Sequence, residues 1–171
     1  DTANMSIGQG ALIFSPLQMS CLIASFARGD SLTVPTILHQ PGRAPSGKLP
    51  RVPLGLSSSD YQAVIDGLEA VIGVGTGKLA RVEGIRVAGK TGTAQIKKDG
   101  KNLNVAWFVC FAPVEKPEIA IAIALEGGEP DVEYGGGRHG APIARAVMRE
   151  YFDKKNRRSA SGPAFKITTT P

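Results

Sequence analysis

The sequence predicts an α/β (α+β) fold in which helices pack on an antiparallel sheet. Two segments with helical spacing lie in the first half of the chain, strand-like segments begin near Ile85, and another helical segment lies near the end. The chain has 171 residues, of which 42% are hydrophobic and 20% are charged. This length is enough to bury one core and the composition is ordinary for a globular protein, so we expect one domain or part of one.

The first helix is predicted from its two ends. Ser15-Pro16 provides an N-cap followed by proline at the first helical position, and Gly29 is a stop signal. Residues 17–27 are apolar on nearly every face, so this helix should be buried. Residues 30–56 contain five prolines, which favour extended segments and turns.

The second helix has the clearest amphipathic pattern of the chain. Residues 57–60 form a capping-box pattern, and the glycine-rich residues 73–77 end the helix in a flexible loop. The apolar residues that recur at helical spacing are Tyr61, Val64, Ile65, Leu68, Val71 and Ile72.

Strand-like segments alternate with turn signals after Ile85. Asp99-Gly100 is a hairpin signal between two of these segments. The predicted strands are residues 85–88 leading into 90–96, residues 105–112 and residues 119–125. We expect them to form a three-strand antiparallel meander.

The last of these strands has two unlike faces. Isoleucine and leucine alternate with alanine along residues 119–125, so one face is bulky and the other is small. A small face allows a helix to lie close against a sheet. Residues 142–152 have apolar side chains at helical spacing, and we predict that this C-terminal helix covers the small face.

The positive charge of the chain is concentrated at its end. The net charge is +5, and the five cations after Asp153 have no acidic residue beside them. The remaining 15 basic and 15 acidic residues balance, which disfavours nucleic-acid binding because phosphates require cations gathered on a folded surface. We expect residues 1–153 to be the folded portion and residues 154–171 to be a basic, disordered tail.

Two chemical patterns overlap at residues 84–93. Residues 84–91 satisfy the phosphate-loop formula, but that formula requires a loop at these positions and a helix that begins at Lys90. The residues before Lys90 are strand-like and a hairpin follows, so we disfavour nucleotide binding. The second pattern, Lys90-Thr91-Gly92, is typical of serine acyl-enzymes that act on acyl-D-alanine amides and β-lactams when it lies on a strand.

The neighbours of this tripeptide carry a family resemblance. Five blocks occur in the family's order: Gly8-Gln9-Gly10 with residues 15–19, residues 75–77, residues 87–95, residues 106–113 and residues 141–144. To about residue 152, the chain resembles the class B penicillin-binding proteins, and among them the elongation-type (penicillin-binding protein 2-like) peptidoglycan D,D-transpeptidases.

The resemblance implies a penicillin-binding/β-lactamase-like transpeptidase fold and roles for four residues. Lys90 would place a catalytic cation beside the nucleophile and the substrate carboxylate. The hydroxyls of Thr91 and Thr93 would bind the terminal carboxylate of a D-alanyl-D-alanine stem peptide or of a β-lactam. The Thr93 N–H would also stabilise the oxyanion, and Gly92 would leave room for the peptide.

Two motifs that such enzymes need are absent from residues 1–171. No serine is followed by lysine three positions later or by asparagine two positions later, so neither Ser-x-x-Lys nor Ser-x-Asn occurs. In the family these motifs precede the five blocks. We therefore expect the C-terminal portion of a transpeptidase domain without its nucleophile, which would be inactive and poorly folded alone.

The resemblance also implies a cellular setting and partners. It places the enzyme on the periplasmic face of the inner membrane, in cell-wall elongation and cell shape, with stem peptides and β-lactams as ligands. A cell-wall glycosyltransferase of the elongation machinery is the expected protein partner, and no cofactor is expected. The alternatives are a D,D-carboxypeptidase or β-lactamase, and a binding or scaffold module of the same fold that has lost its serine.

Other residues have simpler interpretations. His39 and His139 have no partner at metal-ligand spacing, so no metal site is expected. Arg138 lies in a glycine-rich loop. We interpret it as a solvated loop residue, and an approach to the substrate entrance is the alternative. The aromatic residues of 107–111 fit a core, as do Cys21 and Cys110, which lie in apolar surroundings.

Overall fold

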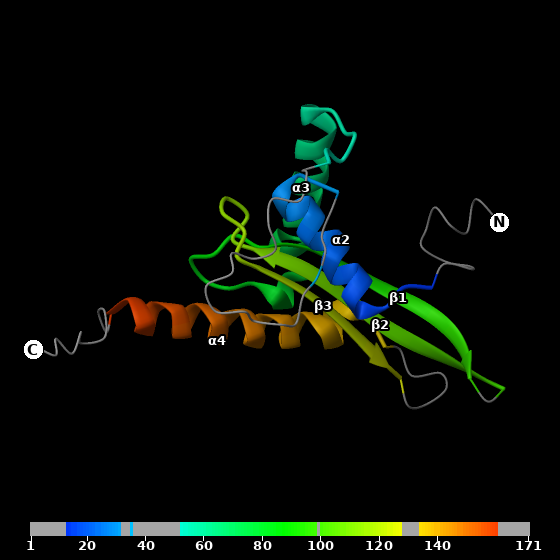
Figure 1. Cartoon of the computed structure of the whole chain (residues 1–171). Helices are drawn as coiled ribbons and strands as arrows, with labels where there is room; N and C mark the ends of the chain where they lie inside the picture. Colours follow the sequence, from blue (N-terminus) through cyan, green and yellow to red (C-terminus); the bar gives the residue numbers. More distant parts are fainter. Residues whose placement is uncertain (1–12, 32–34, 36–51, 99, 128–133, 161–171) are drawn as a thin grey trace, which may run out of the picture.

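A three-strand antiparallel sheet with helices on both faces forms the part of the chain that the computed structural model describes, residues 13–31, 35, 52–98, 100–127 and 134–160 (Figure 1). The predicted fold class is confirmed. The elements are α2 (Pro16–Arg28), α3 (Ser58–Gly73), the short helix η1 (Lys78–Ala80), β1 (Ala88–Lys98), β2 (Lys101–Ala112), β3 (Ile119–Glu126), the π-helical turn η2 (Gly136–Gly140) and α4 (Ala141–Ala160).

Helix α2 begins and ends at the predicted residues. Gln18 N donates a hydrogen bond to Ser15 Oγ at 3.3 Å, and Ser15 N donates to Gln18 Oε1 at 2.8 Å. These reciprocal bonds satisfy amide groups that the first turn of a helix leaves unpaired. Gly29 ends the helix with a φ of 70°, a left-handed conformation that glycine adopts without steric cost.

The prediction that α2 is buried is wrong for the described part of the chain. Ile23 and Ser25 are its buried residues, whereas Leu17 and Leu22 are 57% and 49% exposed. The sheet covers one face of α2, so a helix that is apolar all round keeps apolar side chains on its other face.

Helix α3 starts with the predicted cap and packs through its apolar stripe. Ser57 Oγ accepts a hydrogen bond from Asp60 N at 3.1 Å. Ile65 and Ile72 of the stripe are buried. The two isoleucines lie seven positions apart, so two turns of one helix face contact the core.

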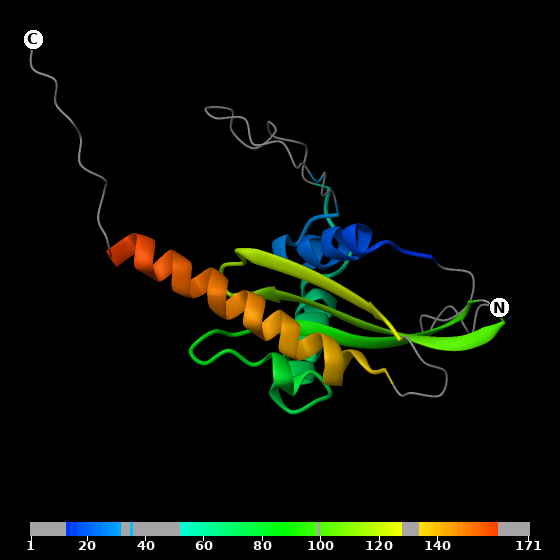
Figure 2. The ribbon, with the colours of Figure 1, turned by 90° about the horizontal axis from the view of Figure 1, so that it is seen from below.

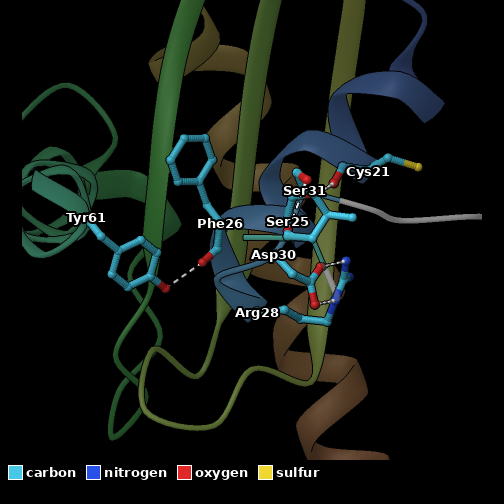
Figure 3. A network of polar contacts seen from close by, with 8 residues as sticks. Cys21, Ser25, Phe26, Arg28, Asp30, Ser31 and Tyr61 are labelled. Carbon is cyan, nitrogen blue, oxygen red and sulfur yellow. Dashed lines mark hydrogen bonds and ion pairs between the residues drawn. The ribbon is translucent and has the colours of Figure 1, made fainter. Parts of the chain in front are cut away.

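A polar contact joins the two N-terminal helices (Figure 3). The Tyr61 hydroxyl of α3 donates to the Phe26 carbonyl oxygen near the end of α2 at 2.6 Å. Close by, Arg28 Nη2 lies 2.6 Å from Asp30 Oδ1, and Asp30 is 6% exposed. The C-terminal end of α2 is therefore held by α3 and by its own following residues.

The strand order is β1-β2-β3, and both pairings are antiparallel. The predicted hairpin joins β1 to β2: Lys98 pairs with Lys101, and Gly100 has a φ of 77°. Asp99, the other residue of that signal, lies outside the described residues. β2 is the central strand, and its apolar side chains contribute to the core on both sides of the sheet.

The alternation of β2 divides the core between two helices. Phe108 and Cys110 belong to a cluster that contains Met148 of α4, whereas Val109 and Phe111 belong to a cluster that contains Ile23 of α2. Figure 2 shows α2 and α4 on opposite faces of the sheet. We call these the α4 face and the α2 face. Phe108 and Phe111 are buried, which confirms their core interpretation, whereas Trp107 is half-buried.

The prediction that the C-terminal helix covers the alanine face of β3 is wrong. Ala120 and Ala122 pack in the cluster of α2, and the isoleucines of β3 pack in the cluster of α4. α4 contributes Ala144, Met148 and Phe152 to the cluster on the bulky face, and α2 contributes Ile23 to the cluster on the small face.

Helix α4 is longer than predicted. The sequence interpretation placed a disordered tail at residues 154–171, whereas α4 continues through Ala160, so this assignment is wrong for the first part of that segment. Lys154 Nζ lies 3.2 Å from Glu150 Oε1 one turn earlier, and lysine and arginine are good helix formers. The rest of the predicted tail lies outside the described residues. In the ranges described, no helix is long and apolar enough to cross a bilayer.

Candidate active site

The four residues 90–93 lie on β1, an edge strand of the described sheet. Lys90 and Thr93 are exposed, while Thr91 and Gly92 are half-buried. An edge strand pairs on one side only, so its other side is suited to binding an extended peptide.

The register divides these residues between the two faces of the sheet. Thr91 lies opposite Phe108 and therefore points to the α4 face, as does Thr93 two residues later. Lys90 lies opposite Val109 and points to the α2 face. The lysine and the two threonines are thus brought together along the edge of β1, from its two sides.

The Lys90 ammonium group is available for an anionic ligand. Its Nζ donates to the carbonyl oxygen of Thr91 at 2.7 Å. Among the residues that the structure describes, no carboxylate forms an ion pair with Lys90. A neighbouring carbonyl accepts a hydrogen bond but does not neutralise the positive charge.

The Thr91 hydroxyl contacts a distant segment of the chain. Its Oγ1 lies 2.7 Å from Oγ1 of Thr76, in the glycine-rich loop after α3. That loop is wound tightly onto the helix end: Gly77 N donates to Val71 O at 2.9 Å, and a Cβ on Gly75 would lie 2.8 Å from Val71 Cα. The sequence interpretation took the glycines of residues 73–77 as a flexible loop and did not predict this contact, whereas here they allow close packing.

The turn η2 packs closely on the same part of the sheet. A Cβ on Gly136 would lie 1.8 Å from the carbonyl oxygen of Trp107, which is the β2 partner of Gly92. A Cβ on Gly137 would lie 2.1 Å from the carbonyl oxygen of Thr76. Only glycine fits at these two positions, so the backbone of η2 lies directly on the strand pair.

Three segments therefore meet around Thr91: the loop of residues 75–77, the strand residues 90–93 and the turn η2. The Cβ position of Gly137 lies 3.3 Å from Thr91 Cγ2, so the methyl group of Thr91 packs under the turn while its hydroxyl faces Thr76. The sequence interpretation used residues 75–77 and 87–95 as family blocks, whereas η2 was not one of the blocks. An approach of its Arg138 to the substrate entrance was only the alternative interpretation.

The histidine and arginine of η2 have different surroundings. The His139 ring stacks on Tyr134 with centroids 4.4 Å apart, and its Nδ1 lies 3.2 Å from the Gly135 carbonyl oxygen. Arg138 is exposed. In the described ranges, no three or more His, Cys, Asp or Glu side chains are grouped to hold a metal ion. His39 lies outside these ranges.

An ion-pair network holds the residues before β1. Arg86 Nη2 lies 2.6 Å from Glu69 Oε2 of α3, and Arg86 Nη1 lies 2.7 Å from Glu115 Oε1 after β2. The hydrogen bond to Glu69 is the main cause that raises the pKa of Arg86. A hydrogen bond to its own backbone, followed by the Arg86 contact, lowers the pKa of Glu115.

The strand geometry also bears on the competing nucleotide hypothesis. Lys90 lies inside the strand β1, whereas a phosphate loop requires a helix that begins at this lysine. The predicted strand position of Lys90, which led us to disfavour nucleotide binding, is confirmed.

The two cysteines do not form a disulfide, and they differ in burial. Cys110 is fully buried on the central strand, and burial raises the pKa of its thiol to about 12. Cys21 is half-buried on α2. The apolar surroundings predicted for both are confirmed for Cys110, whereas Cys21 keeps part of its surface exposed.

Residues 1–149 match the sequence profile of the Penicillin binding protein transpeptidase domain. The chain belongs to this transpeptidase family. Among curated proteins, it is 35% identical over 173 residues to the peptidoglycan D,D-transpeptidase MrdA of Acinetobacter baumannii, with 90% of this chain and 24% of that protein covered. It is 32% identical over 160 residues to stage V sporulation protein D of Bacillus subtilis, with 88% and 24% covered.

Solved structures of the family share the fold. The crystal structure of penicillin-binding protein 2 from Pseudomonas aeruginosa is 28% identical with a TM-score of 0.69, and covers 88% of this chain and 32% of its own. The Helicobacter pylori penicillin-binding protein 2, solved with MreC, is 31% identical with a TM-score of 0.63, and covers 88% and 27%. The resemblance to penicillin-binding protein 2 is confirmed.

The chain spans about a quarter of the length of the curated relatives named here. The relatives' names therefore describe proteins of which this chain matches one portion.

Proposed function

We propose that this chain supplies the substrate-binding strand of a peptidoglycan D,D-transpeptidase that cross-links stem peptides during cell-wall elongation. The observation that carries the proposal is the edge position of β1 in a chain of the transpeptidase family. At this edge Lys90 has no carboxylate partner among the described residues, and the neighbouring Thr91 hydroxyl contacts Thr76. The ligands are acyl-D-alanyl-D-alanine stem peptides and the β-lactams that resemble them.

Lys90, Thr91 and Thr93 have complementary roles in this proposal. The Lys90 cation favours the ionised forms of the nucleophile and of the substrate's terminal carboxylate. The hydroxyls of Thr91 and Thr93 donate hydrogen bonds to that carboxylate, and bonds to charged groups are stronger than neutral ones. The position of Lys90 on the α2 face and of the threonines on the α4 face supports a substrate that lies along the strand edge.

The Thr93 backbone N–H is the proposed strand donor to the oxyanion. Alternate residues of a strand direct their N–H and C=O groups to the same edge. The Thr93 N–H therefore points to the same edge as the Thr91 carbonyl, and the Lys90 side chain reaches that carbonyl. This supports an oxyanion position within reach of the lysine.

Gly92 keeps the strand edge accessible. A Cβ at this position would lie 3.3 Å from Trp107 Cβ, and it would point to the α2 face beside Lys90. A hydrogen atom in its place leaves that space for the substrate backbone.

The proposed reaction has two acyl-transfer steps, with a serine that is not among residues 1–171. Its hydroxyl loses a proton to a base and attacks the carbonyl carbon of the penultimate D-alanine. The C–N bond then breaks, and the terminal D-alanine leaves as an amine that takes up a proton. A second amine from a neighbouring stem peptide attacks the ester, forms the new amide and returns the serine. These steps need no metal or organic cofactor.

Two alternatives share these residues. In a D,D-carboxypeptidase or β-lactamase, water replaces the amine, and product analysis with and without an acceptor amine separates these enzymes from a transpeptidase. In a binding or scaffold module without serine, penicillin would not attach covalently.

The proposed setting is the periplasmic face of the inner membrane. The Helicobacter pylori relative was solved as a complex with MreC. We propose that the protein containing this chain likewise assembles with elongation proteins, including a cell-wall glycosyltransferase. Co-purification of such a glycosyltransferase with the full-length protein would support this partner, and its absence under mild solubilisation would oppose it.

The deciding experiment is covalent labelling of the full-length gene product by a fluorescent penicillin. Reading the coding DNA upstream of Asp1 first identifies the in-frame Ser-x-x-Lys and Ser-x-Asn motifs. We expect a labelled band that survives denaturation and disappears when the motif serine is replaced by alanine. An upstream stop codon with no such motifs, or a full-length protein that penicillin does not label, would overturn the enzymatic proposal.

A further inference from the structure

We propose that Thr76 is a positioning residue that orients the Thr91 hydroxyl toward the carboxylate of the substrate. This inference rests on the proposed function. It starts from the 2.7 Å separation between the two Oγ1 atoms, which come from segments 15 positions apart.

The hydrogen bond between the two hydroxyls can run in either direction. Each hydroxyl has one proton to donate, so one threonine is the donor of this bond and the other is the acceptor. If Thr91 donates to Thr76, its proton is not available to a ligand. If Thr76 donates to Thr91, the Thr91 proton can point to an anion, and the chain of donors strengthens that bond. A carboxylate beside Thr91 therefore selects the second arrangement.

The position of Thr76 does not depend on this bond alone. Its carbonyl oxygen is covered by Gly137, where a Cβ would lie 2.1 Å away. The next residue, Gly77, leaves no space toward the core: a Cβ there would lie 3.0 Å from Ile72 Cδ1 and 3.3 Å from Phe108 Cε2. The loop is thus held between the core and η2, and it presents the Thr76 hydroxyl at a fixed place.

The same packing limits the motion of Thr91. Its methyl group faces the Gly137 position at 3.3 Å, and its hydroxyl faces Thr76. A threonine has one rotatable side-chain bond before its hydroxyl, so these two contacts define where the oxygen lies. What remains free is the direction of the proton, and Thr76 determines it.

The inference predicts a selective defect. Thr76→Val keeps the shape of the side chain and removes the hydroxyl, while Thr76→Ser keeps the hydroxyl and removes a methyl group. In the full-length protein, we expect Thr76→Val to lower the second-order rate constant of acylation by benzylpenicillin about 5- to 10-fold, because a hydrogen bond to a charged ligand loses its preferred direction. Thr76→Ser should restore most of the rate.

A ligand without the carboxylate charge distinguishes positioning from general damage. Acylation by benzylpenicillin methyl ester is expected to be slower than acylation by benzylpenicillin in every protein tested. The rate with the ester should be equal in the wild type and Thr76→Val. The double variant Thr76→Val/Thr91→Val should match Thr91→Val alone, because Thr76 acts through Thr91. Thermal unfolding midpoints of all variants provide the control for folding.

The outcomes separate this inference from the proposed function. If Thr91→Val slows benzylpenicillin acylation and Thr76→Val does not, or if Thr76→Val slows the ester equally, Thr76 does not position Thr91 and the inference is overturned. If Thr91→Val has no effect on acylation, the proposed role of Thr91 fails and the inference fails with it. The inference is supported if benzylpenicillin acylation is slower in Thr76→Val and is restored in Thr76→Ser, while the rate with the ester is unchanged in Thr76→Val.

Discussion

The α carbon of Gly136 lies so close to the carbonyl oxygen of Trp107 that a Cβ there would be 1.8 Å from it. The same Cβ would be 2.9 Å from the carbonyl oxygen of Gly92. Both obstacles are backbone atoms of paired strands, so they cannot rotate away. The turn η2 therefore depends on glycine at this position to lie on the paired strands β1 and β2.

We expect Gly136→Ala in the full-length protein to displace η2 from β1 and to destabilise the domain by roughly 1–3 kcal/mol, as overpacking does elsewhere. Penicillin acylation should fall together with the thermal midpoint. The matched control is Gly135→Ala, because a Cβ at Gly135 meets nothing within 4 Å and its φ of −115° suits any residue. Equal midpoints for the two variants would contradict the packing argument.

Lys90 gives a test of chemistry with little effect on stability. Its side chain is exposed and its ammonium group contacts the Thr91 carbonyl, so Lys90→Met should leave the unfolding midpoint nearly unchanged. We expect penicillin acylation of the full-length protein to fall about 10²–10³-fold, the range for loss of a preorganised charge in an active site. The control is Lys97→Met, an exposed lysine on the same strand. Similar rates for both variants would overturn the proposed catalytic role of Lys90.

The sequence predicted elements whose signals are local. The cap at Ser15, the stop at Gly29 and the hairpin glycine Gly100 each depend on a few neighbouring residues, and all three occur as expected. The strand position of Lys90 was predicted in the same way, because strand-like residues precede it and a hairpin follows.

Relationships between distant segments could not be predicted in this way. The alternation of alanine and isoleucine in β3 identified two faces, but it carried no information about which helix covers which face. The approach of Thr76 to Thr91 depends on the register of β1 and on the packing of η2. The glycines at Gly75, Gly77 and Gly137 were interpreted only as parts of loops, and the close approaches that they allow were not predicted.

The hydrogen bond between α2 and α3 should contribute to stability. Tyr61→Phe keeps the ring and removes the hydroxyl that donates to the Phe26 carbonyl oxygen at 2.6 Å (Figure 3). We expect a loss of about 1 kcal/mol in the free energy of unfolding, typical of one partly buried hydrogen bond. Tyr151→Phe is the control, since its hydroxyl lies 3.5 Å from Glu118 Oε2 at the surface. Equal unfolding midpoints for both variants would show that the bond does not stabilise the helix pair.

Cys110 and Cys21 should react with thiol reagents at very different rates. Burial raises the pKa of Cys110 to about 12, and the thiolate is the reactive form. At pH 8 we expect mass spectrometry of the full-length protein to find iodoacetamide on Cys21, which is half-buried, and to find none on Cys110 until the protein unfolds. Rapid modification of both in the folded state would contradict the buried position of Cys110.

The same burial predicts a dependence of stability on pH. The folded protein favours the neutral Cys110 thiol, so its contribution is fully present below the ordinary thiol pKa of 9.0. As the pH rises from there toward about 12, the unfolded chain loses this proton while the folded chain keeps it, and stability falls. Cys110→Ala should therefore flatten the decline of the unfolding midpoint between about pH 9 and pH 11. An equally steep decline in Cys110→Ala would assign the pH dependence to other groups.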